Sequence, residues 1–291
     1  MKIIKIFIPK NIFKYHTKTI YFEGILSHPR TKYCPTAKKA DWIFLTDRRH
    51  LRPRYKKFAS KIIIFDFCAP DNSPYQYPHA IYFKHKMFRK QGPENVWINY
   101  PKPVYNIQHC LKNECLQFKD KFKGLREVDI SIFFNPSSEG EYHYRERLAQ
   151  FIQEHFSEKY NIWVGVIGQD GKEGRSHTQD DYFRKMFQSK IVVTCGPNTW
   201  EGDYRLYEAL FSGALVFSDK IYTQVIEPFI NKRHLIYYER GNFDELLKLI
   251  PYYLKHSSKR EKIGSRGQKL VLKKHLPRNR IDEVLKVIQK R

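Results

Sequence analysis

The chain has 291 residues, of which 41% are hydrophobic and 15% aromatic, so it is long and apolar enough for two folded domains and is not an intrinsically disordered protein. Its formal net charge is +23, and residues 1–127 carry +17 of it (26 Lys and Arg against 9 Asp and Glu). Such an excess indicates either a basic solvated surface or an anionic partner such as a nucleic acid, a membrane surface or an acidic glycan.

The sequence shows neither a membrane span nor a disulfide framework. Its five cysteines are scattered and odd in number, which is typical of free thiols in a reducing compartment. No apolar run approaches the roughly 20 residues that cross a bilayer. The apolar start at 3–8 is interrupted by Lys5 and resembles a strand more than a signal peptide. These features predict a soluble, cytoplasmic protein.

Four short apolar runs follow one another in the first half of the chain. They lie at 3–8, 42–46, 61–65 and 80–83, and they are continuous rather than alternating. Continuous Ile- and Phe-rich runs indicate strands buried on both faces, as in a parallel sheet covered by helices. The segment 100–124 is punctuated by prolines and then charged, so it predicts the crossing to a second domain.

The second half repeats this alternation of strands and helices. We expect strands at 128–134, 161–167, 189–195, 214–217 and 234–238, with helices near 142–156, 179–187, 203–210, 223–229 and 242–254. A last helix follows Pro277, where apolar residues at 281, 284, 285 and 288 form one stripe. The pattern predicts an α/β protein of two Rossmann-like domains that face a cleft.

The segment 189–217 carries the clearest chemical signal. Between two buried strands lies a short helix that opens at Asp203, a suitable N-cap, and carries Arg205 and Glu208 on one face. The free N–H groups of a helix N-terminus and an adjacent guanidinium suit a diphosphate, and a carboxylate one turn further suits a ribose diol. In the alternative interpretation Asp203 is only a cap, and Arg205 and Glu208 form a surface pair.

The sequence Arg-Leu-Tyr-Glu-Ala-Leu-Phe-Ser-Gly at 205–213, followed by Pro-Phe at 228–229, resembles the donor-binding core of GT-B glycosyltransferases, and most closely that of exostosin-type enzymes. The resemblance extends over about residues 181–230. It implies an acceptor-binding domain at 1–125, a donor-binding domain at 126–276 and a C-terminal helix, 277–291, that returns to the first domain. Retaining GT-B enzymes usually carry two glutamates eight positions apart, but Trp200 stands eight before Glu208, so we expect an inverting transfer.

The resemblance further implies a UDP-sugar donor, for example UDP-xylose, and a glycan or glycoconjugate acceptor, with no cofactor. No Asp-x-Asp motif occurs in the chain, so we expect no metal site and a metal-independent reaction. One alternative is a fucosyltransferase-like GT-B enzyme that uses GDP-fucose. The other is a basic nucleic-acid-binding protein on a Rossmann-like scaffold. We expect no nucleic-acid partner, because the basic residues are not gathered into one helix or arm.

Further donor-binding residues are predicted in the loop after the strand at 128–134. This loop contains Asn135 and Ser137, and the helix that follows it contains Arg145. The loop backbone and the Arg145 guanidinium could approach a phosphate. A plain surface loop explains the same residues equally well.

An inverting transfer needs one general base for the acceptor hydroxyl. Asp71 is the first candidate, because it lies in a proline-bounded loop after the third strand. Asp66 ends that strand and is the second candidate, although it could instead anchor the loop. Asp47 and His79 are weaker candidates.

Overall fold

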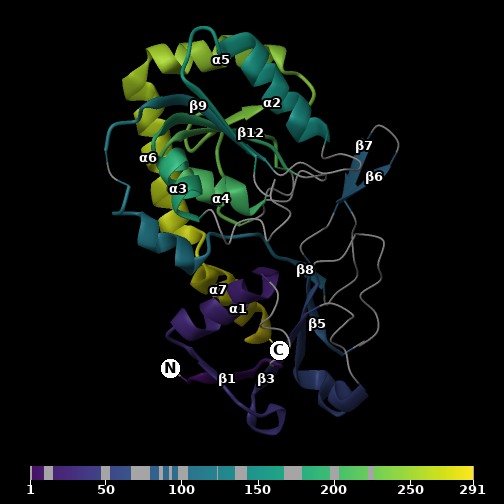
Figure 1. Ribbon diagram of the computed structural model, residues 1–291. Helices are drawn as coiled ribbons and strands as arrows, with labels where there is room; N and C mark the ends of the chain where they lie inside the picture. Colours follow the sequence, from purple (N-terminus) through teal and green to yellow (C-terminus); the bar gives the residue numbers. More distant parts are fainter. Residues whose placement is uncertain are drawn as a thin grey trace. The chain divides into compact units, whose positions relative to one another are not determined.

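The computed structural model describes residues 2–9, 16–46, 53–66, 79–84, 88–91, 94–97, 104–122, 124–134, 143–166, 179–196, 203–221 and 226–290. The chain divides into two compact units, one of Met1–Asn113 with His275–Arg291 and one of Glu114–Lys274 (Figure 1). We call these unit 1 and unit 2. Each contains a parallel sheet with helices, so the predicted α/β fold with two parallel-sheet domains is confirmed.

Unit 1 is built on a six-stranded sheet in which every pairing is parallel. Its strand order is β2-β1-β3-β4-β5-β8. The strands are β1 (Ile4–Phe7), β2 (Thr31–Tyr33), β3 (Trp42–Thr46), β4 (Ile62–Asp66), β5 (Ile81–Lys84) and β8 (Val104–Asn106). The other elements are α1 (His16–Ser27), η2 (Ala37–Lys39), η4 (Pro53–Lys61), the antiparallel pair β6 (Phe88–Gln91) and β7 (Glu94–Trp97), and α7 (Pro277–Ile288).

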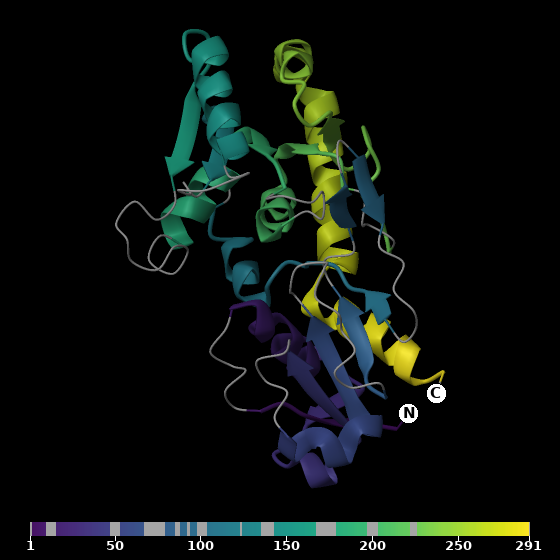
Figure 2. The same cartoon turned by 90° about the vertical axis from the view of Figure 1, so that its right-hand side faces the viewer.

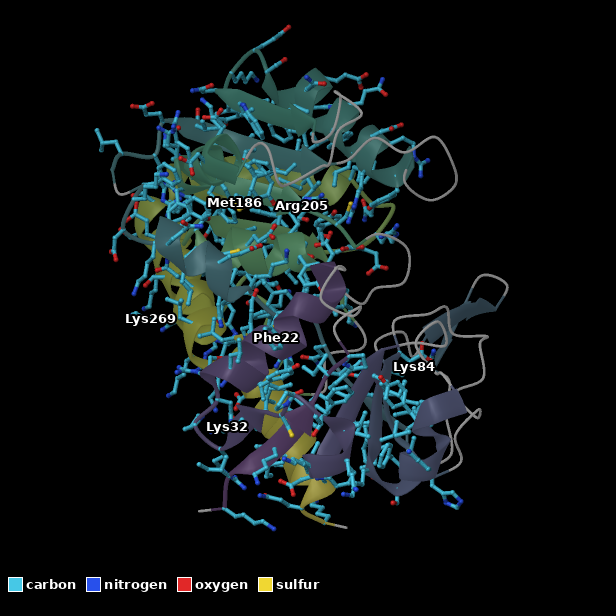
Figure 3. The ribbon with its side chains drawn as sticks, turned by 60° about the horizontal axis from the view of Figure 1, so that its bottom comes forward. Phe22, Lys32, Lys84, Met186, Arg205 and Lys269 are labelled. Atoms are coloured by element: carbon cyan, nitrogen blue, oxygen red, sulfur yellow. The ribbon has the colours of Figure 1, made fainter. Side chains whose placement is uncertain are left out.

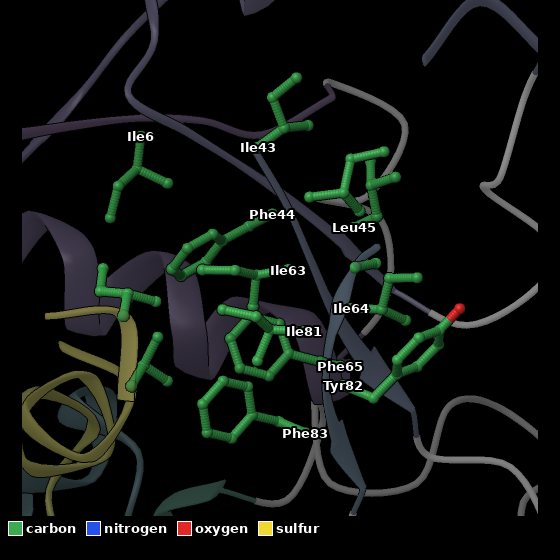
Figure 4. Packing of buried hydrophobic residues seen from close by; sticks show 14 of the residues in the cluster. Ile6, Ile43, Phe44, Leu45, Ile63, Ile64, Phe65, Ile81, Tyr82 and Phe83 are labelled. Carbon is green, nitrogen blue, oxygen red and sulfur yellow. The ribbon is translucent and has the colours of Figure 1, made fainter. Parts of the chain in front are cut away.

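The core of unit 1 joins neighbouring strands through their aromatic rings. Phe65 lies 5.1 Å from Phe44 and 5.7 Å from Phe83 between ring centroids (Figure 4). The apolar stripe of α7 packs into the same core. α7 also meets α1 closely, because a side chain at Gly24 would come within 2.7 Å of the Pro277 carbonyl oxygen. The predicted return of the C-terminal helix to the first domain is therefore confirmed.

Unit 2 has a five-stranded parallel sheet with the order β10-β9-β11-β12-β13. Its strands are β9 (Val128–Phe134), β10 (Ile162–Val166), β11 (Ser189–Thr194), β12 (Leu215–Asp219) and β13 (Ile236–Tyr238). Its helices are α2 (His143–Phe156), α3 (Gln179–Phe187), α4 (Tyr204–Phe211), α5 (Asp244–Lys255) and α6 (Ser257–Lys274), after η5 (Asn113–Phe118) at the crossing from unit 1. α2 and α5 share one core with β9, β11 and β12, and α6 is the long yellow-green helix in Figure 2.

One expectation for unit 2 is wrong, and one of its helices is missed by the sequence patterns. The helix expected near 223–229 is absent over its described part, because Glu227 has a φ of 48° and is followed by Pro228, which has no N–H to continue a helix. The sequence patterns also did not predict α6, whose two buried glycines, Gly264 and Gly267, are poor helix formers. Among the described helices, none has the length and apolar character needed to span a membrane.

Candidate active site

The strand order of unit 2 reverses at β9. From β9 the chain passes to β10 on one side and then comes back to β11 on the other. In open parallel sheets, ligands bind outside the carboxyl ends of the strands at such a reversal. α2 follows β9 and α4 follows β11. The beginnings of these two helices therefore define the candidate site.

Arg145 and Asp203 connect these two helix beginnings. The Nη2 atom of Arg145, in the first turn of α2, donates to Asp203 Oδ2 over 2.6 Å and to the carbonyl oxygen of Cys195, just after β11, over 3.0 Å. Asp203 is the N-cap of α4, and its Oδ1 accepts from the backbone N–H of Leu206. Burial lowers the pKa of Arg145, but the charge and hydrogen bond of Asp203 more than offset this effect, so the pKa is raised. Arg145 is thus a charged structural bridge at this edge.

Arg205 brings a second guanidinium to the start of α4 (Figure 3). Its side chain is 4% exposed, and its Nη1 atom lies 3.6 Å from Asp203 Oδ2. Its Nε and Nη1 atoms have no hydrogen-bond partner within the described part of the chain. Buried guanidinium N–H groups that lack an acceptor are unfavourable. Arg205 therefore suits an anion that supplies acceptor oxygens.

Glu208 lies one turn further along α4 and is also buried. Its Oε2 atom accepts a hydrogen bond of 2.7 Å from the hydroxyl of Tyr182 in α3. The alternative in which Arg205 and Glu208 form a surface pair is therefore wrong, because neither side chain is on the surface. Tyr182 was not among the predicted site residues, since nothing in its local sequence shows that α3 packs beside α4.

A second charged pair lies at the carboxyl end of β12. Asp219 is buried, accepts from the backbone N–H of Gly196 over 2.7 Å, and accepts from Arg240 Nη1 over 2.6 Å. Arg240 also donates to the carbonyl oxygen of Gly196, and its guanidinium lies 4.2 Å from the ring centroid of Tyr144. Burial raises the pKa of Asp219, whereas Arg240 and the Gly196 N–H oppose the rise. The Asp219–Arg240 pair holds the backbone at Gly196, just after β11. The only sequence signal for this pair was that an aspartate ends the apolar run of β12.

The predicted catalytic candidates belong to unit 1. Asp66 ends β4, and its Oδ2 lies 2.8 Å from the Nζ atom of Lys84, which is fully buried on the neighbouring strand β5. This buried ion pair suits an anchor at the sheet edge. His79 is exposed. Asp47 and Asp71 lie outside the described residues, as do Asn135 and Ser137 in unit 2, and their roles stay predictions.

In the described ranges, no three His, Cys, Asp or Glu side chains are grouped as metal ligands would be.

A family model described as glycosyl transferase-like matches residues 140–286, which is half of the chain. The protein belongs to the glycosyl transferase-like family. The matched span contains Arg145, Asp203, Arg205 and Glu208, and the chain is therefore a glycosyltransferase.

Solved structures of similar fold extend over nearly the whole glycosyltransferase. An alpha-glucosyltransferase in complex with UDP and a 13-mer DNA has a TM-score of 0.57 at 10% identity, covering 99% of this chain and 100% of its own. Anabaena HepE in complex with UDP-glucose has a TM-score of 0.56 at 11% identity, with coverage of 99% and 100%. An alpha1,3-fucosyltransferase has a TM-score of 0.56 at 12% identity, with coverage of 99% and 89%. These likenesses show a GT-B fold. No curated protein matches the sequence.

Proposed function

We propose that this glycosyltransferase uses a UDP-sugar, for example UDP-xylose, and transfers the sugar to a hydroxyl of a glycan or glycoconjugate. The observation that carries the donor assignment is the buried guanidinium of Arg205, whose Nε and Nη1 atoms have no hydrogen-bond partner among the described residues. It lies at the start of α4, close to the strand-order reversal where parallel sheets bind ligands. Diphosphate oxygens would supply charge-assisted hydrogen bonds to it.

Glu208 takes the ribose of the nucleotide in this proposal. A carboxylate accepts hydrogen bonds from a vicinal diol, and Glu208 lies three residues beyond Arg205 on the same helix face. The hydroxyl of Tyr182 holds one carboxylate oxygen in place over 2.7 Å. Tyr182 is therefore a positioning residue for Glu208.

The transfer is inverting in this proposal, because Trp200 rather than a second glutamate stands eight positions before Glu208, and Asp71 is the first candidate for the general base. The departing diphosphate is stabilised by Arg205 rather than by a divalent cation, which agrees with the absence of an Asp-x-Asp motif from the sequence. In the same proposal, the basic residues of the first half of the chain attract an acidic acceptor by their positive charge. The cytoplasmic location of the enzyme stays a prediction.

Calorimetry with UDP and GDP tests the donor assignment. Wild-type protein should bind UDP more tightly than GDP, and Glu208→Ala should lose about 1–3 kcal/mol of UDP binding, the range for a hydrogen bond to a charged group. Glu154→Ala, on an exposed position of α2, is the matched control and should bind UDP as the wild type does. Unchanged UDP binding by Glu208→Ala would exclude the ribose assignment. Tighter binding of GDP would favour the fucosyltransferase-like alternative.

A further inference from the structure

The helix α6 carries a row of cations along one side. It contains seven Lys and Arg residues against a single acidic residue. Five of the cations are exposed and follow one another at intervals of three, four, three and four residues: Lys259, Lys262, Arg266, Lys269 and Lys273. This spacing places them on one face of the helix over about 21 Å. We call them the α6 basic stripe, and Lys269 marks it in Figure 3.

The other side of α6 is buried in unit 2 and fixes the orientation of the stripe. A side chain at Gly264 would come within 2.4 Å of the Gly213 carbonyl oxygen, and one at Gly267 within 2.4 Å of the His234 carbonyl oxygen. The helix backbone therefore lies directly against neighbouring backbone. The 53 Lys and Arg residues of the chain are not gathered into one helix, but seven of them lie on α6, and the small net charge of the second half conceals this local segregation.

Within the described part of the chain, no acidic side chain forms a salt bridge with a cation of the stripe. The salt bridges of α6 within the described ranges involve Arg260 with Glu261 and Lys274 with Glu227, and none of the five stripe cations takes part in one. Arg233, also exposed, adds positive charge near Arg266, since both act on the imidazole of His234. The positive charge of this face is thus available to an external anion.

We propose that the α6 basic stripe binds the surface of an anionic lipid bilayer. A fixed, straight row of cations on an exposed helix face complements a flat layer of negative headgroups, and clusters of four to eight Lys and Arg on such a helix suit this surface. Four of the five cations are lysines, which act as point charges on flexible stems and need no fitted acceptor geometry. α6 has no exposed large hydrophobic residue, so the attraction is electrostatic and reversible by salt.

The experiment measures co-sedimentation of the full chain with phosphatidylcholine vesicles that contain or lack phosphatidylserine. The stripe variant is Lys262→Gln with Arg266→Gln and Lys269→Gln. The matched control is Lys32→Gln with Lys38→Gln and Lys39→Gln, which removes equal charge from exposed positions of unit 1. Because each cation near such a surface strengthens binding about fivefold, the stripe variant should bind the anionic vesicles about a hundredfold more weakly. The control variant should change little.

Several results would overturn the proposal. Wild-type protein that does not prefer anionic vesicles, or that stays bound as salt rises from ~0.1 M to ~1 M, contradicts it without recourse to a variant. An equal loss of binding in both variants would show that only total charge matters.

Displacement by soluble glycerophosphoserine at the same concentration of headgroup would indicate a site for a free phosphate. Loss of duplex DNA binding by the stripe variant, with vesicle binding unchanged, would assign the stripe to nucleic acid. UDP affinity should be equal in all three proteins, which separates this proposal from the donor assignment.

Discussion

Arg145, which is buried, and the partly buried Asp203 form an ion pair of 2.6 Å that joins the first turn of α2 to the N-cap of α4. The two oxygens of Asp203 have separate tasks, since Oδ1 caps α4 and Oδ2 holds Arg145. The single carboxylate of Asp203 thus holds the beginnings of α2 and α4 in a fixed position relative to each other, next to the strand-order reversal.

This double task makes Asp203 more important for stability than an ordinary cap. Asp203→Ala should lower the free energy of unfolding by about 3–5 kcal/mol, because it removes the cap and leaves the buried Arg145 charge without its partner. Asp203→Asn keeps a capping oxygen and should lose less. Urea unfolding measures both. If Asp203→Ala costs only about 1 kcal/mol, the typical value for a cap alone, the ion pair contributes nothing.

The Asp66–Lys84 pair offers a test that separates an anchor from a catalyst. Asp66→Asn should lower the free energy of unfolding by about 3–5 kcal/mol, because it removes one member of a buried ion pair with the Lys84 ammonium. Asp66→Leu combined with Lys84→Met should recover most of that loss, since apolar side chains can replace a buried ion pair. Urea unfolding and transfer assays are run together. A folded but inactive double variant would show that the Asp66–Lys84 pair takes part in catalysis and is not only an anchor.

Asp71 is the predicted general base. Asp71→Asn should still bind UDP yet transfer sugar about two orders of magnitude more slowly, the usual contribution of a positioned base. Single-turnover assays at saturating donor measure the effect, and Asp41→Asn is a matched aspartate control. Full activity of the Asp71 variant would instead assign the general base to Asp66, Asp47 or His79.

Transfer or donor hydrolysis should survive an excess of EDTA, because the sequence lacks the Asp-x-Asp carboxylates that hold a divalent cation on the donor diphosphate. Rates measured before and after chelation test this prediction. Activity that disappears with EDTA and returns with Mn²⁺ would show that a metal takes part.

His234 should make the protein less stable in acid. Burial and the charges of Arg233 and Arg266 lower its pKa from the usual 6.5, and its Nδ1 atom accepts the Ile230 N–H, which a protonated ring could not do. The unfolded chain then binds the proton more readily, so stability is lost as the pH falls below 6.5 toward the folded pKa. Arg266→Gln should raise the pKa of His234 in an NMR titration, whereas Arg278→Gln in unit 1 should not. An unchanged titration in the Arg266 variant would show that Arg266 does not contribute to the shift, which would then come from burial and Arg233.

Local patterns predicted much of the fold. The continuous apolar runs of β4, β11 and β12 are strong signals, because strands buried on both faces have almost no polar residues. Asp203 was predictable as a cap because capping depends on residues only three apart. α6 was not predictable in the same way, since Gly264 and Gly267 disfavour an isolated helix and are accommodated only by close packing on unit 2.

The candidate site was only partly predictable for a related reason. Arg205 and Glu208 lie on one short helix, so their spacing alone places them on one face. Tyr182 reaches Glu208 from another helix, and Arg240 reaches Asp219 across 21 positions of sequence. Such partners are set by the strand order, which no local pattern contains.

The position of α7 in unit 1 has a consequence for how the chain folds during synthesis. Unit 1 is interrupted by all of unit 2, and the core of unit 1 needs Ile281, Val284 and Leu285 of α7. The ribosome must therefore make residues 114–274 between the two parts of that core, which takes roughly 8–30 s at the usual rates of bacterial and eukaryotic translation. Unit 2, which is continuous, can begin to fold as it is made during this interval. The side of α1 that packs against α7 stays uncovered until α7 emerges, so nascent chains should depend on chaperones that shield unit 1 rather than unit 2.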